Sequence, residues 1–84
     1  MNEWCVYLLK CADETLYCGV TKDIKNRLKT HNEGKGAKYT RGRLPVTLVC
    51  FVEGLTKSDA YSMEYKVKRL PKYKKAEYLH KAAR

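Results

Sequence analysis

The sequence predicts a small α/β (α+β) domain in which three strands combine with three helices. Two short apolar and aromatic runs lie close together near the start of the chain, and a third follows at residues 46–53. Between and after these runs, apolar residues recur at helical spacing. The chain has 84 residues, of which 44% are hydrophobic, enough for one modest core and too many for a disordered chain. We therefore expect a single domain over residues 1–84.

The first two strands are expected to form a hairpin. Residues 4–10 are apolar on both sides of the strand alternation, which indicates a strand buried on both faces at the centre of a sheet. Residues 12–14 supply a turn, and residues 15–20 return as the second strand. Tyr7 and Tyr17 then face the same side of the hairpin if the register allows.

A helix is expected directly after the second strand, over about residues 22–33. Thr21 is a suitable N-cap residue, and Asp23 would place a negative charge in the first helical turn. Ile24 and Leu28 are four residues apart and form the apolar stripe of this helix. The second strand therefore runs into the helix through a very short corner.

Residues 34–43 read Gly-Lys-Gly-Ala-Lys-Tyr-Thr-Arg-Gly-Arg, and we expect a loop there. The segment has three glycines, four basic side chains and no acid. It lacks the spacing of a P-loop, and it follows a helix instead of opening one. Its side chains suit contacts to phosphates and stacking on a base, namely Lys35, Lys38, Arg41, Arg43 and Tyr39. A flexible, solvated loop is the alternative.

The last part of the chain is predicted to hold a third strand and two helices. The strand covers residues 46–53 and ends at Gly54. Thr56 and Asp59 have the spacing of a capping box, with Asp in place of the usual Glu or Gln, before a helix to about Leu70. Pro71 suits the first turn of a final helix that ends near Ala82. The side chains expected to face the core are Ala60, Met63, Val67 and Leu70 in one helix and Ala76, Leu79 and Ala83 in the other.

Charge is distributed unevenly along the chain. The net charge is +9, from 18 basic and 9 acidic side chains. Residues 1–33 carry five of each kind, so thirteen basic and four acidic side chains lie in residues 34–84. An excess of this kind suits a polyanionic partner, although a simple gain in solubility would explain it as well.

The four cysteines are predicted to be small buried side chains. Their spacing includes no C-x2-C pair, which argues against a zinc site. Residues 1–4 lack the basic start and apolar run of a signal peptide, so we expect a cytoplasmic location and no disulfides. No run approaches the ~20 apolar residues needed to span a bilayer, so no membrane association is expected. These cysteines are Cys5, Cys11, Cys18 and Cys50.

Three polar side chains are candidates for a site at the corner between the second strand and the first helix. Tyr17 leaves the strand just before Gly19, where the missing side chain lets another group approach closely. Arg27 and His31 are four residues apart, on the same side of the helix. A phenol, a guanidinium and an imidazole can therefore converge here. A core tyrosine beside a solvated arginine is the alternative.

Glu64 is a candidate metal ligand. It lies at the edge of the apolar face of the predicted helix, next to Met63. A hard cation such as Mg²⁺ needs only one or two carboxylates, because it keeps several waters. A surface ion pair with Lys68, four residues further on, is the alternative.

Taken together, these residues resemble the GIY-YIG nuclease superfamily. The resemblance covers residues 3–70 and includes Val6-Tyr7, Tyr17-Cys18-Gly19, Arg27 and Glu64. Residues 31–43 are similar to those of its small stand-alone bacterial branch. This resemblance implies a three-stranded antiparallel sheet flanked by helices, and hydrolysis of DNA phosphodiester bonds with one divalent metal, Mg²⁺ or Mn²⁺.

The resemblance also implies roles for individual residues. Glu64 would hold the metal, and Arg27 would bind the scissile phosphate and offset charge in the transition state. Tyr7 and Tyr17 would position or activate the attacking water. His31 matches a histidine that some members carry one turn after the arginine.

The sequence departs from the family pattern at several positions. Cys5, Val6 and Cys18 replace the usual glycine and isoleucines, which are packing positions. Val20 stands where several relatives carry a lysine, so a second cationic contact to the phosphate or the water is in doubt. The sequence holds no separate DNA-binding domain of the kind that many relatives attach.

Three functions are compatible with the sequence. The first is a metal-dependent nuclease that acts on DNA. The second is a nucleic-acid-binding module on the same fold with little or no catalysis, since the basic later part of the chain supports both equally. The third is an interaction domain whose positive charge meets an acidic protein.

Overall fold

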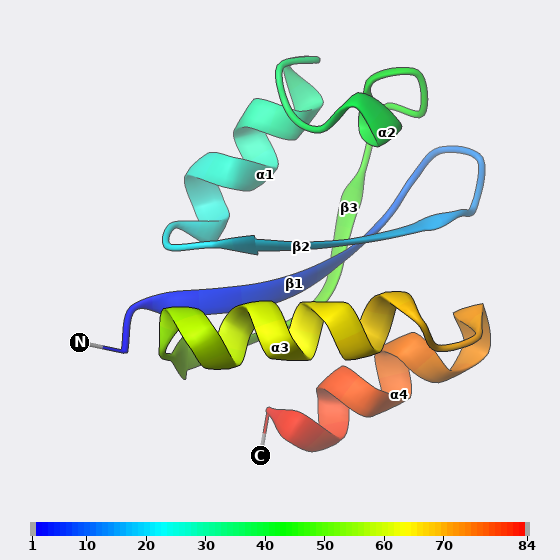
Figure 1. Cartoon of the computed structure of the whole chain (residues 1–84). Coiled ribbons are helices and arrows are strands. Elements are labelled where there is room, and N and C mark those ends of the chain that lie inside the picture. Colours follow the sequence, from blue (N-terminus) through cyan, green and yellow to red (C-terminus); the bar gives the residue numbers. More distant parts are fainter. Residues whose placement is uncertain (1, 84) are drawn as a thin grey trace.

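The computed structural model describes residues 2–83 and contains one three-stranded antiparallel sheet. The strands are β1 (Trp4–Lys10), β2 (Leu16–Thr21) and β3 (Thr47–Leu55), in the spatial order β2-β1-β3 (Figure 1). The central place of β1 agrees with its apolar pattern, since residues 5–9 are each at most 5% exposed. The predicted antiparallel sheet is therefore confirmed.

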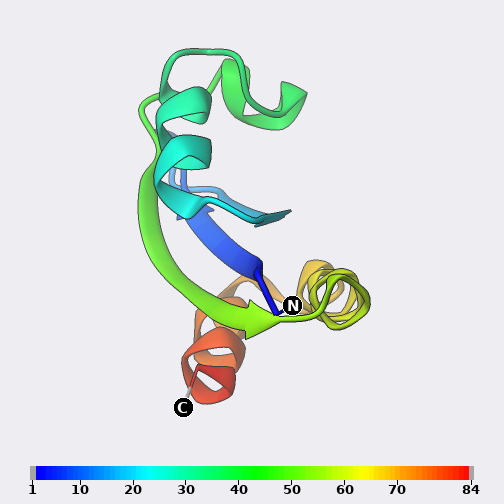
Figure 2. The same cartoon turned by 90° about the vertical axis from the view of Figure 1, so that its left-hand side faces the viewer.

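Helices cover both faces of this sheet. Figure 2 shows α1 (Ile24–Asn32) and α2 (Lys38–Arg41) on one side, and α3 (Lys57–Lys68) and α4 (Lys72–Ala82) on the other. α3 packs against β1 and β2, whereas α4 packs chiefly against β3. No helix within residues 2–83 is long and apolar enough to cross a membrane.

The number of helices differs from the prediction of three. The extra helix is α2, which lies inside the segment predicted to be a loop, residues 34–43. A helix of four residues is too short to show a helical repeat of apolar residues, so the pattern of the sequence cannot reveal it. Its one buried residue is the polar Thr40, which is 0% exposed.

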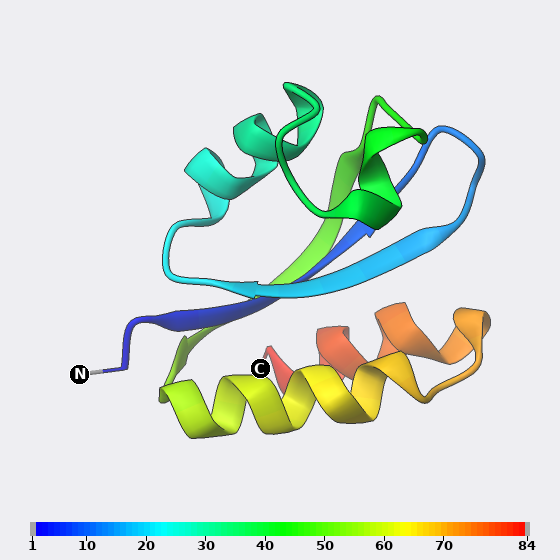
Figure 3. The same ribbon diagram turned by 45° about the horizontal axis from the view of Figure 1, so that its top comes forward.

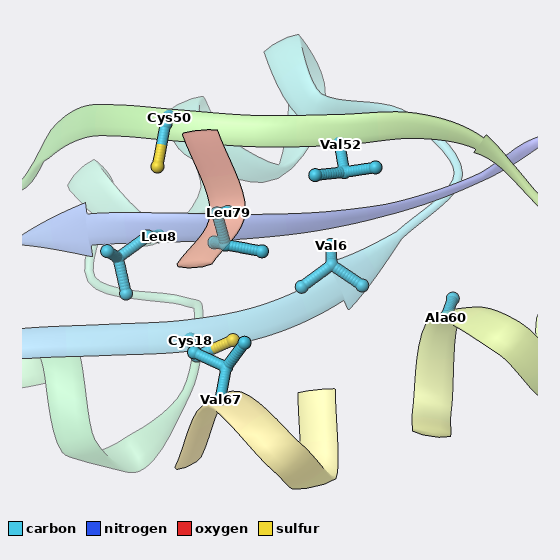
Figure 4. Close-up of a cluster of buried hydrophobic side chains, with 8 residues drawn as sticks. All are labelled: Val6, Leu8, Cys18, Cys50, Val52, Ala60, Val67 and Leu79. Atoms are coloured by element: carbon cyan, nitrogen blue, oxygen red, sulfur yellow. The ribbon is translucent and has the colours of Figure 1, made fainter. Parts of the chain in front are cut away.

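The core consists of two clusters, because side chains alternate across the sheet. Val6 and Leu8 of β1 face α3 and α4, and they pack with the other side chains shown in Figure 4, namely Cys18, Cys50, Val52, Ala60, Val67 and Leu79. Tyr7 and Leu9 face the α1 side, in a cluster with Cys5, Cys11 and Val46. All four cysteines are buried thiols, as predicted.

Several boundaries differ from the predictions. α1 is capped by Asp23, whose carboxylate accepts from the Asn26 N–H at 3.1 Å. Thr21, the predicted cap, still pairs with Cys5 in the sheet, so the helix begins later in the chain than predicted. β3 continues through Gly54 to Leu55, which pairs with Trp4.

The two C-terminal helices follow the predictions more closely. Thr56 caps α3 by accepting from the Asp59 N–H at 3.0 Å, as predicted. Pro71 directly precedes α4 as its N-cap residue instead of lying in its first turn. Leu79 is fully buried, but Ala83 lies beyond the helix and is exposed, so the prediction that it packs inward is wrong.

The end of α1 is fixed to the start of β3 by Asn32. Its side-chain amide donates to the Val46 carbonyl at 3.1 Å and accepts from the Val46 N–H at 2.8 Å. These two bonds satisfy backbone groups that lie just before the strand ladder begins. They fix the position of the C-terminal turn of α1, which carries His31, relative to the sheet.

Candidate active site

The structure brings together the four candidate catalytic side chains on the α1 face of the sheet. Tyr7 pairs with Gly19 across the β1–β2 ladder, and Tyr17 pairs with Leu9. The two tyrosines are therefore diagonal neighbours, with ring centroids 6.3 Å apart. His31 packs edge-on against both rings, 5.9 Å from the ring of Tyr7 and 5.4 Å from that of Tyr17.

A chain of hydrogen bonds links these groups. The phenolic oxygen of Tyr7 lies 2.9 Å from Nε2 of His31, and Nε of Arg27 donates to the same oxygen over a longer 3.4 Å. On the other side of the imidazole, Nδ1 of His31 lies 2.8 Å from Oγ1 of Thr40. Thr40 in turn donates to the Ala37 carbonyl at 2.9 Å. The guanidinium, phenol, imidazole and hydroxyl are thus connected without a gap.

Two glycines allow this close arrangement. A Cβ atom at Gly19 would overlap the phenol of Tyr7 and would come within 2.9 Å of Cε2 of its ring. A Cβ atom at Gly36 would overlap the imidazole of His31 and would come within 2.7 Å of its Cγ. Because the backbone can pack directly on both rings only where a side chain is missing, each glycine fixes the position of one ring.

Burial sets the protonation states in this cluster. Tyr7 is 1% exposed, and burial raises the pKa of its phenol to about 12 even though the hydrogen bond from Arg27 lowers it. Burial also lowers the pKa of His31 below its ordinary value, and the positive charge of Arg27 lowers it further. At neutral pH, therefore, the phenol keeps its proton and the imidazole is neutral.

Arg27 and Tyr17 form the more accessible part of the cluster, since both are only half-buried. The ring of Tyr17 stacks on that of Tyr39 at 5.9 Å, with 26° between the planes. The guanidinium of Arg43 lies 4.1 Å from the centroid of the Tyr39 ring. These contacts fasten α2 to the exposed edge of β2.

Glu64 lies on α3, which covers the opposite face of the sheet from the cluster (Figure 2). α3 runs along β2, which is an edge strand, as Figure 3 shows. The ammonium of Lys68 lies 3.4 Å from the Glu64 carboxylate and 5.8 Å from the centroid of the Tyr17 ring. Glu64 therefore lies beside the edge where Tyr17 is accessible, and the ion pair considered in the sequence analysis is present.

The carboxylate of Glu64 is less exposed than those of the other ion pairs. Its side chain is 19% exposed, against 47–71% for the acidic partners elsewhere. Residues 2–83 contain no group of three or more His, Cys, Asp or Glu side chains placed to hold a metal ion. A metal here would thus rest on one carboxylate and complete its shell with water and substrate oxygens, as Mg²⁺ commonly does.

The basic residues of the segment 34–43 differ in availability. Lys35, Lys38 and Arg41 are exposed. Arg43 instead pairs with Asp13 at 3.0 Å and donates to the Tyr39 carbonyl at 2.7 Å. The charge of Arg43 is therefore already partly compensated. Its side chain links α2 to the turn after β1.

Sequence reasoning missed Thr40, Gly36 and Lys68 as parts of the site. Thr40 and Gly36 lie in a glycine-rich basic segment whose composition indicates only a loop. One signal was present: a histidine on the buried side of a helix needs a partner for each ring nitrogen. Lys68 supplies a cation 5.8 Å from the centroid of the Tyr17 ring.

Comparisons with known sequences point to the same group of proteins. The GIY-YIG catalytic domain matches residues 3–77. A UPF0213 protein of Lactococcus lactis is 55% identical over 65 residues, which cover 77% of this chain and 62% of that protein. A UPF0213 protein of Bacillus velezensis is 50% identical over 84 residues, covering 99% of this chain and 84% of that protein.

Two solved structures share the fold. A UPF0213 protein from Bacillus halodurans, determined by NMR in solution, is 43% identical, with 99% of this chain and 87% of that chain covered and a TM-score of 0.59. A protein from E. faecalis is 35% identical, with 96% and 85% covered and a TM-score of 0.63. The chain therefore belongs to the GIY-YIG nuclease superfamily and, within it, to the group of small UPF0213 proteins.

Proposed function

We propose that this protein is a nuclease that uses Mg²⁺ or Mn²⁺ to hydrolyse DNA phosphodiester bonds. One observation carries the proposal: the hydroxyl of Tyr7 lies between the guanidinium of Arg27, which donates to it, and the imidazole of His31, which is 2.9 Å away. This arrangement can move a proton away from water next to a group that attracts phosphate. Membership of a nuclease superfamily supports the same reaction class.

Tyr7 and His31 would act together on the attacking water. A phenol with a pKa of about 12 is too rarely ionised at neutral pH to serve as a base alone. It can accept a proton from water if its own proton passes at the same time to Nε2 of His31, 2.9 Å away. The lowered pKa of His31 keeps the imidazole neutral and ready to accept.

Arg27 and Tyr17 would hold the substrate. Attack on a phosphodiester adds negative charge to the phosphoryl oxygens, and a fixed guanidinium stabilises that charge more in the transition state than in the ground state. Arg27 is half-buried and already oriented by its contact with Tyr7. Tyr17 is half-buried beside Tyr7, so its hydroxyl can position the water or a phosphate oxygen.

The donor chemistry of Glu64 suits a hard divalent cation, because a carboxylate oxygen is the ligand that Mg²⁺ and Mn²⁺ prefer. When bound, the metal would supply Lewis-acid stabilisation of the phosphoryl oxygens. The ammonium of Lys68, on a flexible chain and exposed, would release the carboxylate and remain near Tyr17. The exposed Lys35, Lys38 and Arg41 would contact the phosphates of DNA next to the site.

The test compares Glu64→Gln with the wild type on single- and double-stranded DNA, with Mg²⁺, Mn²⁺ or a chelator. The substitution keeps the volume and removes the charge, so we expect metal-dependent cleavage to disappear. Binding to DNA without metal should be unchanged or tighter, because a negative charge facing a polyanion has been removed. Glu77→Gln is the matched control, since Glu77 forms an ion pair of the same spacing with Lys81 on α4.

A nucleic-acid-binding module is the second candidate, favoured by the ion pair that already engages Glu64. Binding without cleavage by the wild type under every metal condition would replace the nuclease proposal with this one. Cleavage by a folded Glu64→Gln at the wild-type rate would show that the metal is held elsewhere. Thermal melts of all three proteins exclude misfolding as the cause of either result.

A further inference from the structure

His31 is enclosed so completely that its two partners must determine its tautomer. His31 and Thr40 are 0% exposed and Tyr7 is 1% exposed. Nδ1 of the ring lies 2.8 Å from Oγ1 of Thr40, and Nε2 lies 2.9 Å from the oxygen of Tyr7. A neutral imidazole has one donor nitrogen and one acceptor nitrogen, so one of these two hydroxyl groups accepts and the other donates.

The hydroxyl proton of Thr40 already has an acceptor. Oγ1 of Thr40 donates to the Ala37 carbonyl at 2.9 Å, in the N-terminal turn of α2. A hydroxyl has a single proton, so the bond between Oγ1 and His31 is one that Oγ1 accepts. Nδ1 therefore carries the ring proton, and Nε2 presents its lone pair to Tyr7.

The contacts of Tyr7 require the same tautomer of His31, with the proton on Nδ1. Its oxygen accepts from Nε of Arg27, and its own proton then points to Nε2 of His31. In the opposite tautomer, Nε2–H and the guanidinium would both donate to this oxygen, and the Tyr7 proton would have no acceptor among the side chains that contact it. Each buried side-chain nitrogen and oxygen within residues 2–83 has a partner. Of the two tautomers, only the first also gives the hydroxyl protons of Tyr7 and Thr40 and the ring proton of His31 an acceptor each.

We propose that Thr40 is a positioning residue whose hydroxyl holds His31 in the Nδ1–H tautomer and so makes Nε2 the acceptor for the Tyr7 proton. During turnover, the O–H bond of Tyr7 breaks as its oxygen takes a proton from the attacking water, and the Tyr7 proton binds Nε2. The resulting imidazolium remains bonded to Thr40 through Nδ1–H and later returns its proton to the Tyr7 oxygen, which passes one proton on to solvent. One proton has then moved from water to solvent through the protein, and Tyr7 is unchanged.

This role also explains why the segment 34–43 is structured. Thr40 points inward from α2, while Lys38, Tyr39 and Arg41 are exposed on the same four-residue helix. Gly36 lets the backbone before α2 pack directly on the imidazole. The segment that faces nucleic acid in the proposed function is thus the segment that sets the tautomer. The proposal rests on that function for its rate measurements only.

The tautomer can be measured by long-range ¹H–¹⁵N NMR of the uniformly labelled protein near neutral pH. The chain has two histidines, and the exposed His80 provides an internal reference for an unconstrained ring. For His31 of the wild type we expect a protonated Nδ1 and an unprotonated Nε2. Thr40→Val keeps the branched shape without the hydroxyl, and we expect it to shift the ring toward the Nε2–H tautomer.

The rate measurements use the same proteins. Thr40→Val should lower kcat for cleavage at least tenfold with little change in KM, and Thr40→Ser should restore both the rate and the NMR signature. Thr30→Val is the matched control, because Thr30 directly precedes His31 but its hydroxyl does not contact the imidazole. The Thr30 hydroxyl donates to the Asn26 carbonyl at 2.8 Å instead. It should leave the tautomer and the rate unchanged.

An Nε2–H tautomer in the wild type would overturn the proposal, and this measurement needs no variant to fold. A Thr40→Val protein that keeps both the Nδ1–H tautomer and the wild-type rate would overturn it as well. If the wild type shows the expected tautomer but cleaves no substrate, the proposed nuclease function fails while the assignment of Thr40 stands.

Discussion

Tyr7 belongs to the core and to the site at once, and this double role governs its chemistry. Its ring packs in the cluster on the α1 face of the sheet. Its hydroxyl forms hydrogen bonds with two other side chains, His31 and Arg27. The burial that raises its pKa to about 12 would disable it as an isolated base. The neutral imidazole of His31 offsets this high pKa, because the phenol can pass its own proton to the imidazole while it accepts one from water.

Arg27→Lys is the sharpest test of the phosphate-binding role at the residue scale. Lysine keeps one charge but loses the planar fork that can grip two oxygens, so we expect kcat/KM for cleavage to fall by about 10²-fold or more. Arg27 is half-buried and its bond to Tyr7 is long, so the melting temperature should change by only a few degrees. Lys25→Ala, at an exposed position on α1, is the control, and near-normal turnover of Arg27→Lys would remove the proposed role.

At the scale of elements, the strands and longer helices could be predicted because each carries a repeated pattern. β1 shows burial on both faces, and α3 shows a helical stripe behind the capping residue Thr56. The boundaries were less predictable where tertiary pairing decides them, as at Thr21, which remains in the ladder opposite Cys5. α2 could not be predicted, since its position depends on a bond from Thr40 to a histidine nine residues away.

The same distinction applies to the candidate site. Tyr7, Tyr17, Arg27 and His31 could be identified because strand alternation and helical spacing place them on one face. The residues that hold them in place could not, because Thr40, Gly36 and Asn32 act through individual contacts between segments, which leave no periodic pattern. The chemical roles of all these residues stay predictions until activity is measured.

For the whole molecule, the uneven charge gives a testable expectation for DNA binding without metal. If Lys35, Lys38 and Arg41 contact phosphates, the slope of log K against log salt on duplex DNA should become shallower by roughly 0.9 for each one neutralised to Gln. Arg43→Gln should have less effect, because Arg43 already pairs with Asp13. Fluorescence anisotropy across a salt series gives these slopes, with Lys81→Gln on α4 as control. Affinity that ignores salt would contradict a nucleic acid partner.

Metal-dependent cleavage should depend on the hydroxyl of Tyr7, which the substitution Tyr7→Phe removes. Phenylalanine fills the same space in the core, and the loss of the hydroxyl leaves His31 and Arg27 short of one partner each, at a cost of about 1–3 kcal/mol in stability. A single-turnover cleavage assay at a temperature where both proteins are folded compares the variant with the wild type. We expect metal-dependent cleavage by the wild type and a rate at least ~10²-fold lower for Tyr7→Phe, with DNA binding retained. A folded Tyr7→Phe protein that cleaves as fast as the wild type would show that the hydroxyl takes no part in cleavage.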